Sequence, residues 1–313
     1  MPCHNRCEAL RLTLEALCRQ SVPGSDYEVL VVDQASTDGS RALVRSYAAP
    51  YTLRLIEQDG KYGISVARNA GVQAAESEFI LLLDADLLAD ENLVDAHLAR
   101  HAAAPEALLC GRVLPYLPAY TGFVDHIANP EAGLDRGTGN EPFAFYQAFG
   151  GHLAFSKAVF AHVGPFDPLL KGFEDIEFAY RASQLGYAIL NNARAVSYHN
   201  HPRSPKERFE QARSYNRMLP IVFERYPELK GQIPGLSDFE PVNWQMDRGK
   251  RLINKLRVRV FGLPAVQSGA QAVLFSLDRS CRAPRLVRFL FWQLLIGNGY
   301  LGFREGAARN SAA

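Results

Sequence analysis

Two carboxylates, Asp84 and Asp86, directly follow the uninterrupted apolar run Phe79–Leu83. A short run of this kind is typical of a strand covered on both faces, as in a parallel sheet between helix layers. Ligands of open α/β sheets bind beyond the carboxyl ends of the strands, where both acids emerge. Because residues i and i+2 of an extended chain point to one side, the two carboxylates need a positive partner. A Mg²⁺ or Mn²⁺ ion with a phosphate has this chemistry, and an acidic solvated turn is the alternative.

The chain up to about residue 200 alternates strands and helices. The apolar spacing predicts strands at 27–32, 53–57, 79–83, 107–113 and 188–198, and helices at 8–19, 36–47, 64–75, 91–100, 156–162 and 174–185. This order predicts a three-layer α/β/α domain with a mostly parallel sheet. Between the predicted strand at 107–113 and the predicted helix at 156–162, residues 115–149 are rich in Pro, Gly, Tyr and Asn, a composition typical of binding loops or lids.

Composition excludes a disordered chain, because 48% of the 313 residues are hydrophobic and 21% are charged. The length suffices for one large domain and an appendage. The net charge of +1 hides an asymmetry: residues 248–313 contain twelve Lys or Arg and two acids, a net +10, which leaves −9 for residues 1–247. The five cysteines are odd in number and form no C-x-x-C pair, which favours a reducing compartment.

The beginning of the pattern lacks one element. A doubly wound domain should open with a buried strand that leads into the PCHNR turn, whereas this sequence opens at Met1-Pro2. Either the strand is lost or the true start lies upstream of Met1. We favour the second explanation, because the loss would remove a central strand. No signal-peptide pattern precedes the first predicted helix.

Six segments together carry a family resemblance: PCHNR, EVLVVDQASTDGS, GISVARNAG, LLLDADLL, GGHLAFSKAVFAHVGPFDPLLKGFEDIEFAYRASQLGY and AVSYHNH. Their order and spacing resemble the family 2 glycosyltransferases with a GT-A fold, and the second half resembles the branch with a galactosyltransferase-like catalytic segment. The resemblance covers about residues 2–202. It implies a catalytic domain at 1–205, and the pattern of the remaining residues predicts a helical, basic-apolar region at 206–313. It also implies sugar transfer from a nucleotide diphosphate donor, typically UDP-linked.

Several positions match the family's donor-binding residues. Asp33 matches the carboxylate that accepts a hydrogen bond from the nucleobase, although the family often has Asp-Gly or Asn-Gly where this chain has Gln34-Ala35. Arg68 could pair with phosphate or base. The implied nucleotide and donor residues are Pro2, His4, Asn5, Asp33, Arg68, Asp84, Gly150 and Gly151. The alternatives are a helix-capping Asp33, a surface Arg68, and an ordinary turn at the glycine pair.

The same resemblance implies a role in donor and metal binding for Asp84 and Asp86. It implies that Asp84 lies near the ribose and the metal, and that Asp86 ligates the cation that bridges the diphosphate. His199, preferred to His201, is implied as a further ligand, and an imidazole beside hard oxygens favours Mn²⁺ over Mg²⁺. The alternative is a pair of exposed histidines in a polar loop.

Glu174 and Asp175 are the implied catalytic acids. Asp175 stands at the family position that takes the proton from the acceptor hydroxyl, and Glu174 is implied to hydrogen-bond the donor sugar or the acceptor. Adjacent acids under apolar cover can have a raised pKa. On the alternative interpretation they are first-turn acids that complement a helix dipole. One base without a covalent nucleophile implies a single displacement with inversion.

The tail is predicted to form helices at 248–260, 265–277 and 286–303. Its interleaved basic and apolar residues favour a helix pair on an anionic membrane surface, and packing on the catalytic domain is the alternative. Nucleic acid is not expected as a partner. We therefore expect an enzyme at the cytoplasmic membrane face, or in the cytoplasm, that acts on a glycan or lipid-linked acceptor in cell-surface polysaccharide or glycoconjugate synthesis.

Two other classes of function are alternatives to a glycosyltransferase. A sugar-nucleotide nucleotidyltransferase would be expected to show a Gly-rich basic loop after its first strand, and PCHNR is not such a loop. A non-catalytic nucleotide-binding module would lack the acids in the second half, whereas Glu174 and Asp175 are present.

Overall fold

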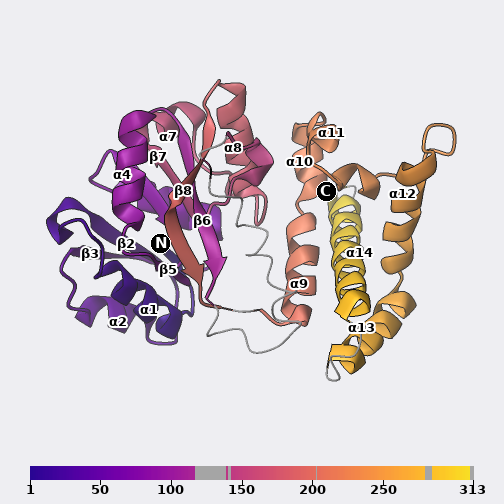
Figure 1. Cartoon of the computed structure of the whole chain (residues 1–313), viewed down its shortest axis with the longest axis horizontal. Helices are drawn as coiled ribbons and strands as arrows, with labels where there is room; N and C mark the ends of the chain where they lie inside the picture. Colours follow the sequence, from indigo (N-terminus) through magenta and orange to yellow (C-terminus); the bar gives the residue numbers. More distant parts are fainter. Residues whose placement is uncertain (117–138, 140–141, 202, 279–283, 311–313) are drawn as a thin grey trace. The chain divides into compact units, whose positions relative to one another are not determined.

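The computed structural model describes residues 1–116, 139, 142–201, 203–278 and 284–310 (Figure 1). The described residues up to 201 form one compact unit, and those from 203 onward form a second. Most of the predicted loop at 115–149 lies outside the described residues.

The first unit begins with a three-stranded parallel sheet in the order β1-β2-β3. The strands are Pro2–Cys3, Glu28–Gln34 and Thr52–Gln58, and the helices α1, α2 and α3 are Cys7–Leu17, Ser40–Ser46 and Ile64–Ala74. Six of the seven residues of β2 are buried, as its continuous apolar run predicts. A short 3-10 helix, η1 (Gly24–Asp26), precedes β2.

A second, five-stranded sheet has the order β4-β7-β6-β8-β5. Its strands are β4 (Phe79–Leu83), β5 (Leu87–Ala89), β6 (Leu108–Pro115), β7 (His152–Ser156) and β8 (Ile189–His199). The accompanying helices are α4 (Leu93–Ala103), η3 (Phe145–Gln147), α7 (Lys157–Val163) and α8 (Glu174–Gln184). The predicted helices and strands of this part are confirmed to within a few residues at their ends.

The expectation of a mostly parallel sheet needs correction here. β6 and β8 are parallel, but β4 with β7, β5 with β8, and β6 with β7 are antiparallel. Strands β5 and β7 were not predicted from the sequence, because each is short and is stabilised by a partner strand far away in the chain. The second sheet is therefore mixed. Gly150 and Gly151 directly precede β7, and the pairing of β7 with β4 places them beside the carboxyl end of β4.

Two apolar clusters hold the strand ends in place. One contains Leu10 and Leu14 of α1 together with Val31 of β2, Leu83 of β4 and Leu87 of β5. The other contains a group of aromatic rings in which Phe166 and Phe178 stack with centroids 4.4 Å apart. Because the residues on both sides of Asp84–Asp86 are core residues, the acidic turn has a fixed position.

The second unit is helical (Figure 1). Its elements are α9 (Pro205–Asn216), α10 (Leu219–Arg225), α11 (Leu229–Gln232), η4 (Leu236–Phe239), α12 (Gly249–Phe261), α13 (Pro264–Asp278) and α14 (Pro284–Asn310). The helix α14 packs against α9, α10, α12 and α13. A Cβ on Gly302 or Gly306 would overlap the carbonyl oxygens of Arg213 and Arg217, so these glycines permit the close approach of α14 to the chain around α9.

The three predicted tail helices are confirmed as α12, α13 and α14. Within the described residues, no single helix has the length and apolar character needed to cross a membrane. One bent pair, Gly249–Phe261 with Pro264–Leu277 at 83°, meets those criteria of length and composition.

Candidate active site

Arg68 of α3 is the centre of a buried ion-pair cluster. Its Nη1 donates to Glu174 Oε1 at 2.7 Å, and its Nη2 lies 3.4 Å from Asp84 Oδ1. Arg68 is 3% exposed, so it is not the surface arginine of the alternative interpretation. The structure thus brings together three of the predicted site residues, from α3, the end of β4 and the start of α8.

Gly150 and Gly151 bring the backbone against this cluster. A Cβ on Gly150 would lie 2.5 Å from Arg68 Nη1, and a Cβ on Gly151 would lie 2.5 Å from Asp84 Oδ2. The Gly150 N–H donates to Asp175 Oδ2 at 2.9 Å, and the Asp84 N–H donates to the Gly151 carbonyl at 2.9 Å. Any side chain at either position would push the acids apart.

Asp175 is held beside the cluster by backbone donors. In addition to the Gly150 bond, its Oδ1 accepts from the Ile176 N–H at 2.9 Å. The helix α8 starts at Glu174, after Phe173 in the left-handed region at φ 65°. Both acids therefore lie in the first turn of α8, where the positive end of the helix dipole stabilises negative charge.

The cluster contains more negative groups than Arg68 can neutralise. Burial raises the pKa of Glu174 to about 7, with a further rise from Asp175, and Arg68 opposes both effects. Burial also raises the pKa of Asp84 against the opposing charge of Arg68, with a smaller rise from Asp86. The raised pKa of Glu174 lets this side chain hold a proton near neutral pH.

Asp86 and His199 are neighbours across the β5–β8 pair. Leu87 is in register with His199, and the Asn200 N–H donates to the Asp86 carbonyl at 3.0 Å. His199 Nε2 lies 3.9 Å from Asp86 Oδ2. Two donor atoms that bind one ion with bonds of about 2.1 Å lie at most about 4.2 Å apart, so this pair fits a shared divalent cation. The described residues contain no group of three or more His, Cys, Asp or Glu placed to hold a metal.

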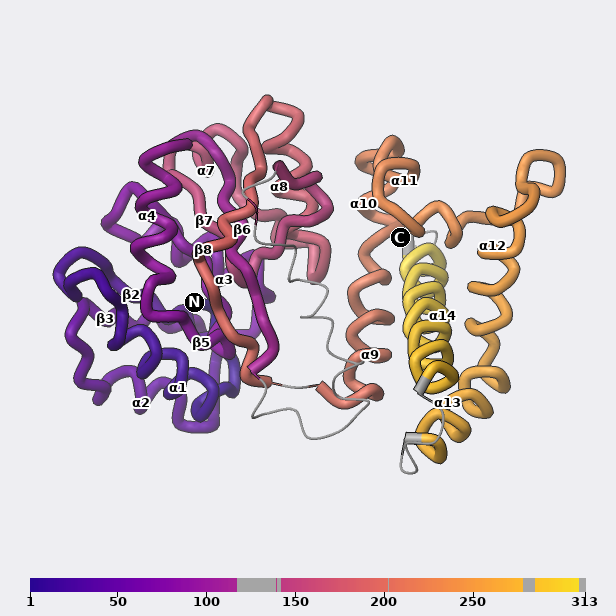
Figure 2. Tube along the Cα trace, viewed as in Figure 1, coloured from indigo at the N-terminus to yellow at the C-terminus, as the bar shows by residue number. Residues whose placement is uncertain are grey.

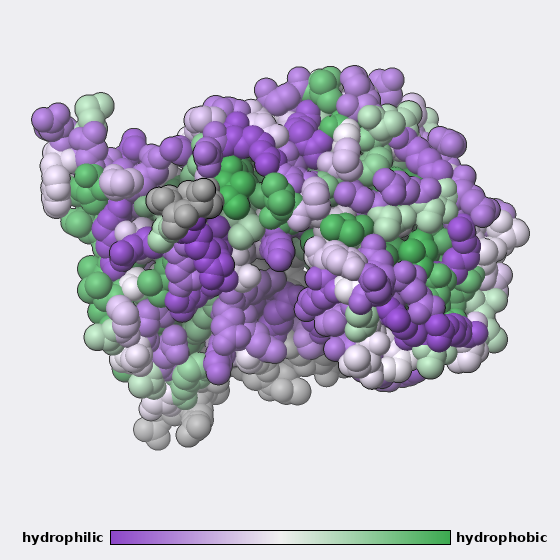
Figure 3. Space-filling view, turned by 180° about the vertical axis from the view of Figure 1, so that it is seen from behind, coloured by the Kyte–Doolittle hydropathy of each residue, from purple (hydrophilic) through white to green (hydrophobic). Residues whose placement is uncertain are grey.

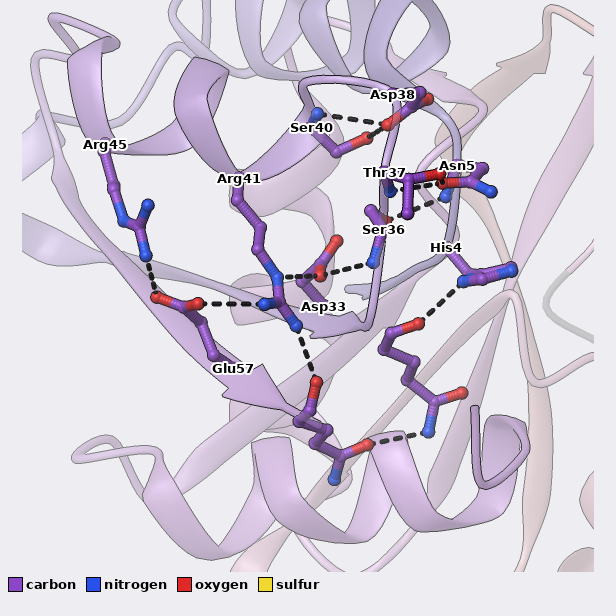
Figure 4. A network of polar contacts seen from close by, with 12 residues as sticks. His4, Asn5, Asp33, Ser36, Thr37, Asp38, Ser40, Arg41, Arg45 and Glu57 are labelled. Atoms are coloured by element: carbon purple, nitrogen blue, oxygen red, sulfur yellow. Dashed lines mark hydrogen bonds and ion pairs between the residues drawn. The ribbon is translucent and has the colours of Figure 1, made fainter. Parts of the chain in front are cut away.

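A second polar region surrounds Asp33 at the end of β2 (Figure 4). Asp33 Oδ1 accepts from the Ser36 N–H at 3.0 Å and from Arg41 Nε at 2.5 Å. Burial alone would raise the pKa of Asp33, but the Ser36 and Arg41 hydrogen bonds and the Arg41 charge outweigh it and lower the pKa. Among the described residues, its other oxygen, Oδ2, is buried without a hydrogen-bond partner.

The PCHNR turn is joined to the STDGS loop (Figure 4). His4 Nδ1 lies 2.6 Å from the Gln34 carbonyl, and the Thr37 N–H donates to Asn5 Oδ1 at 2.8 Å. Asn5 and Ala35 have φ of 52° and 55°, a region that glycine and asparagine tolerate better than alanine. The Ala35 conformation explains why a glycine suits this turn. Pro2 pairs with Val32 in β1.

Two residues of these networks were missed from the sequence. Arg41 pairs with Asp33 and Glu57, and Asn69 exchanges hydrogen bonds of 2.8 and 2.9 Å with the backbone of Phe166. Asn69 directly follows Arg68 in the sequence. This position next to a predicted site residue was the one feature that could have indicated a role for Asn69. Nothing in the local sequence marks Arg41, which is eight residues from Asp33.

Fold and site together define a nucleotide-sugar-dependent transferase of the GT-A type, with a helical C-terminal unit. The chain belongs to Glycosyl transferase family 2, whose family profile matches residues 1–163. It is therefore a glycosyltransferase of an inverting family that uses nucleotide sugars. The predicted galactosyltransferase-like segment lies largely beyond the matched residues and stays a prediction.

Several known proteins are similar to this chain. It is 27% identical to validoxylamine A glucosyltransferase of Streptomyces hygroscopicus subsp. jinggangensis, over 88% of this chain and 74% of that protein. It is 24% identical to chondroitin synthase of Escherichia coli, over 72% of this chain but 38% of that protein, so it spans well under half of that relative.

Solved structures share the fold. The Staphylococcus aureus TarS fragment 1–349 superposes with a TM-score of 0.53 at 19% identity, over 99% of this chain and 90% of that one. The mannosyltransferase PcManGT from Pyrobaculum calidifontis, solved with GDP-Man and Mn²⁺, gives a TM-score of 0.59 at 18% identity, over 95% and 85% of the two chains.

Proposed function

We propose that this chain is a metal-dependent hexosyltransferase that moves a sugar from a UDP-linked donor to a hydroxyl of a glycan or lipid-linked acceptor. The observation that carries the proposal is the convergence of Asp84, Gly150 and Glu174–Asp175 on Arg68. The Asp86–His199 pair adjoins this cluster, because Asp86 follows Asp84 by two residues. These groups come from five separated segments of the chain.

The donor diphosphate requires positive charge. Asp86 and His199 would hold the divalent cation, Mn²⁺ in preference to Mg²⁺, and the cation would neutralise charge that develops on the departing diphosphate. PcManGT was solved with a sugar nucleotide and Mn²⁺, which supports this choice. Both terminal nitrogens of Arg68 pair with Glu174 and Asp84, so we assign it to positioning these acids rather than to direct contact with phosphate.

The acceptor hydroxyl requires a base. Asp175 takes the hydroxyl proton while the acceptor oxygen forms its bond to the anomeric carbon and the bond from that carbon to the diphosphate oxygen breaks on the opposite face. The product therefore has inverted anomeric configuration, and the diphosphate leaves with the electron pair. The N–H groups of Gly150 and Ile176 hold the Asp175 carboxylate in place for this step. Glu174 is assigned to orienting the donor sugar or the acceptor.

The nucleobase requires an acceptor for its N–H group. Asp33 Oδ2 has no partner among the described residues, so an N–H of uracil would satisfy it after a small shift of the loops that cover it. His4, Asn5 and Pro2 frame the same edge of β2. TarS was solved with UDP and with UDP-GlcNAc, which supports a UDP-linked donor.

The second unit offers a surface for a membrane that would carry the acceptor. Ile253, Leu256 and Val260 are exposed on α12 at spacings of three and four residues, so they share one side of the helix. Lys250 and Arg251 are exposed on the same helix. Figure 3 shows hydrophobic and hydrophilic patches interleaved on the second unit. We assign the enzyme to peripheral contact with the anionic cytoplasmic face of the membrane, in cell-surface polysaccharide or glycoconjugate synthesis.

A donor-hydrolysis panel tests the activity. Purified protein is incubated with UDP-linked and GDP-linked hexoses in Mn²⁺, Mg²⁺ or EDTA, and released nucleotide is measured. We expect release from a UDP-linked donor that is highest with Mn²⁺ and absent in EDTA. Preferred release from a GDP-linked donor would overturn the base assignment, and equal release in EDTA would overturn the metal assignment.

A further inference from the structure

Three buried polar side chains form a hydrogen-bonded chain that the proposed reaction does not use. They are His97 of α4, His152 of β7 and Ser197 of β8, and none is more than 1% exposed. The Nε2 atoms of the two histidines lie 3.0 Å apart, and His152 Nδ1 lies 2.9 Å from Ser197 Oγ. Figure 2 shows α4 alongside β6 and β8. A paired polar network in the interior favours one arrangement of the elements that it joins.

Asn192 of β8 sets the direction of the hydrogen bonds. Its Nδ2 donates to the Ala96 carbonyl at 3.0 Å and lies 3.4 Å from His97 Nδ1. Because an amide nitrogen only donates, His97 Nδ1 accepts, and the neutral ring carries its proton on Nε2. His152 therefore accepts at Nε2 and donates from Nδ1 to Ser197. Burial lowers the pKa of His152 to about 3 and that of His97 well below its usual value, so both rings are neutral near pH 7.

The His152 side chain crosses a neighbouring strand to reach its partner. The strand β6 lies between β7 and β8 in the sheet. A Cβ on Gly111 of β6 would lie 2.1 Å from the His152 ring. A glycine at this position therefore leaves the space through which the imidazole extends over β6 to Ser197.

The backbone pairing of β6 is interrupted at the same level of the sheet. The described pairing of β6 with β7 ends with Cys110 opposite Leu153, so His152 is the first residue of β7 beyond it. The register of β6 with β8 shifts between Gly111 and Arg112. On this side of β7, the His152 side chain takes the place of backbone hydrogen bonds in joining the start of the strand to the rest of the sheet.

The start of β7 is the part of this strand that contacts the candidate active site. Gly150–Gly151 directly precedes His152, and the N–H of the first glycine donates to Asp175 Oδ2 at 2.9 Å. At the other end of the chain, Ser197 precedes His199 by two residues of β8, so the two side chains point to the same side of that strand. The hydrogen bonds thus join the backbone that holds Asp175 to the strand that carries His199.

We propose that His152 is a positioning residue for sugar transfer: through Ser197 it holds the Gly150–Gly151 backbone, and with it Asp175, at a fixed place relative to His199. The bond from His97 fixes the tautomer and the orientation of the His152 ring. This inference rests on the proposed function, which assigns Asp175 to proton abstraction and His199 to the metal. A misplacement of about 1 Å between reacting groups can cost about 10²-fold in rate.

Two substitutions of His152 separate its two side-chain hydrogen bonds. The amide of Asn occupies the place of Nδ1, so His152→Asn keeps an N–H toward Ser197. The amide of Gln occupies the place of Nε2, so His152→Gln keeps an acceptor for His97 and loses the bond to Ser197. Turnover should fall by about 10–100-fold in His152→Gln and in Ser197→Ala, with UDP affinity close to that of the wild type, and His152→Asn should recover most of the loss.

The stability of these variants is measured in parallel. Each substitution of His152 removes one buried hydrogen bond, so both should lower Tm by a similar amount, about 2–8 °C. Tyr51→Phe is the control for lost stability, because the Tyr51 hydroxyl donates to the Leu14 carbonyl at 3.0 Å in the apolar core. It should lower Tm and leave turnover unchanged.

A readout that needs no turnover is the amide exchange of Gly150, followed by NMR. Exchange should become at least about tenfold faster in His152→Gln and Ser197→Ala, and it should change little in His152→Asn and Tyr51→Phe. Ser197→Ala removes a single hydroxyl, so it decides the question by itself if His152→Gln does not fold.

Three results would overturn the inference: equal losses of turnover in the two His152 variants, losses that follow Tm alone across all variants, or Gly150 exchange that is unchanged in Ser197→Ala. A wild type without turnover of any sugar donor, but with Gly150 exchange that depends on Ser197, would overturn the proposed function alone. In that case the hold of His152 on the Gly150–Asp175 contact would be confirmed.

Discussion

Arg68 and Glu174 form a buried ion pair of 2.7 Å between residues 106 positions apart in the sequence. Removing one partner of such a pair leaves an uncompensated charge in the interior, which is far more costly than removing both. The pair links the helix α3 to the first turn of α8, so it fixes Asp175 relative to Asp84. Structural integrity and the geometry of the site therefore depend on the same contact.

Arg68→Met is expected to destabilise the first unit by about 3–5 kcal/mol, because Asp84 and Glu174 lose their shared cation. Adding Glu174→Gln should recover part of this loss, since the second buried charge is then removed. Urea unfolding of the wild type, both single variants and the double variant measures the coupling. If the losses of unfolding free energy in the two single variants add up to the loss in the double variant, the Arg68–Glu174 contact has no coupling energy.

Glu174 also makes stability depend on pH. Its folded pKa of about 7 lies above the ordinary value of 4.5, so the folded state binds the proton more tightly. This contribution is fully present below pH 4.5 and is lost as the pH rises through 7, a change of about 3 kcal/mol. Chelator-treated wild type should lose stability relative to Glu174→Gln between pH 5 and 8. Parallel stability curves for the two proteins would contradict the raised pKa.

Asp86→Ala should abolish Mn²⁺-dependent UDP binding, because the cation loses the carboxylate that fixes it against the diphosphate. Calorimetric titration of UDP with and without Mn²⁺ measures the effect. Asp95→Ala is the matched control, since Asp95 is an exposed acid on the neighbouring helix α4. Unchanged Mn²⁺-dependent affinity in Asp86→Ala would remove this residue from the metal site.

Asp175→Asn keeps the shape of the side chain and a carbonyl oxygen for the Gly150 N–H, but it cannot take a proton. Turnover should fall by about 10²–10⁴ while donor affinity stays close to that of the wild type. Steady-state rates and UDP-sugar titrations separate the two quantities. Turnover near the wild-type value would exclude Asp175 as the base, and lost donor affinity would indicate a binding role instead.

Ile253→Glu with Val260→Glu should reduce sedimentation with anionic vesicles by at least about tenfold, because two apolar contacts are replaced by negative charge. Leu169→Glu with Leu185→Glu is the control. Its two positions in the first unit are 65% and 47% exposed, against 63% and 47% for Ile253 and Val260. Equal sedimentation of the two double variants would exclude α12 as the membrane face.

The sequence alone determined the features that depend on near neighbours. Apolar periodicity located the helices and most strands, and the abrupt change from Phe79–Leu83 to Asp84 placed the acids at a strand end. Side-chain alternation and burial act over a few residues, so they leave a pattern in the chain.

Only the tertiary structure decided which of these groups meet. The short strand His152–Ser156 owes its conformation to β4 and β6, which come from elsewhere in the chain, and its antiparallel insertion makes the sheet mixed. Arg68 was predicted beside a nucleotide but is held by Asp84 and Glu174, and Asp33 was predicted at a base pocket but also carries an ion pair with Arg41. The energies of such pairs depend on burial and on distances between remote segments, and neither is encoded in local residue patterns.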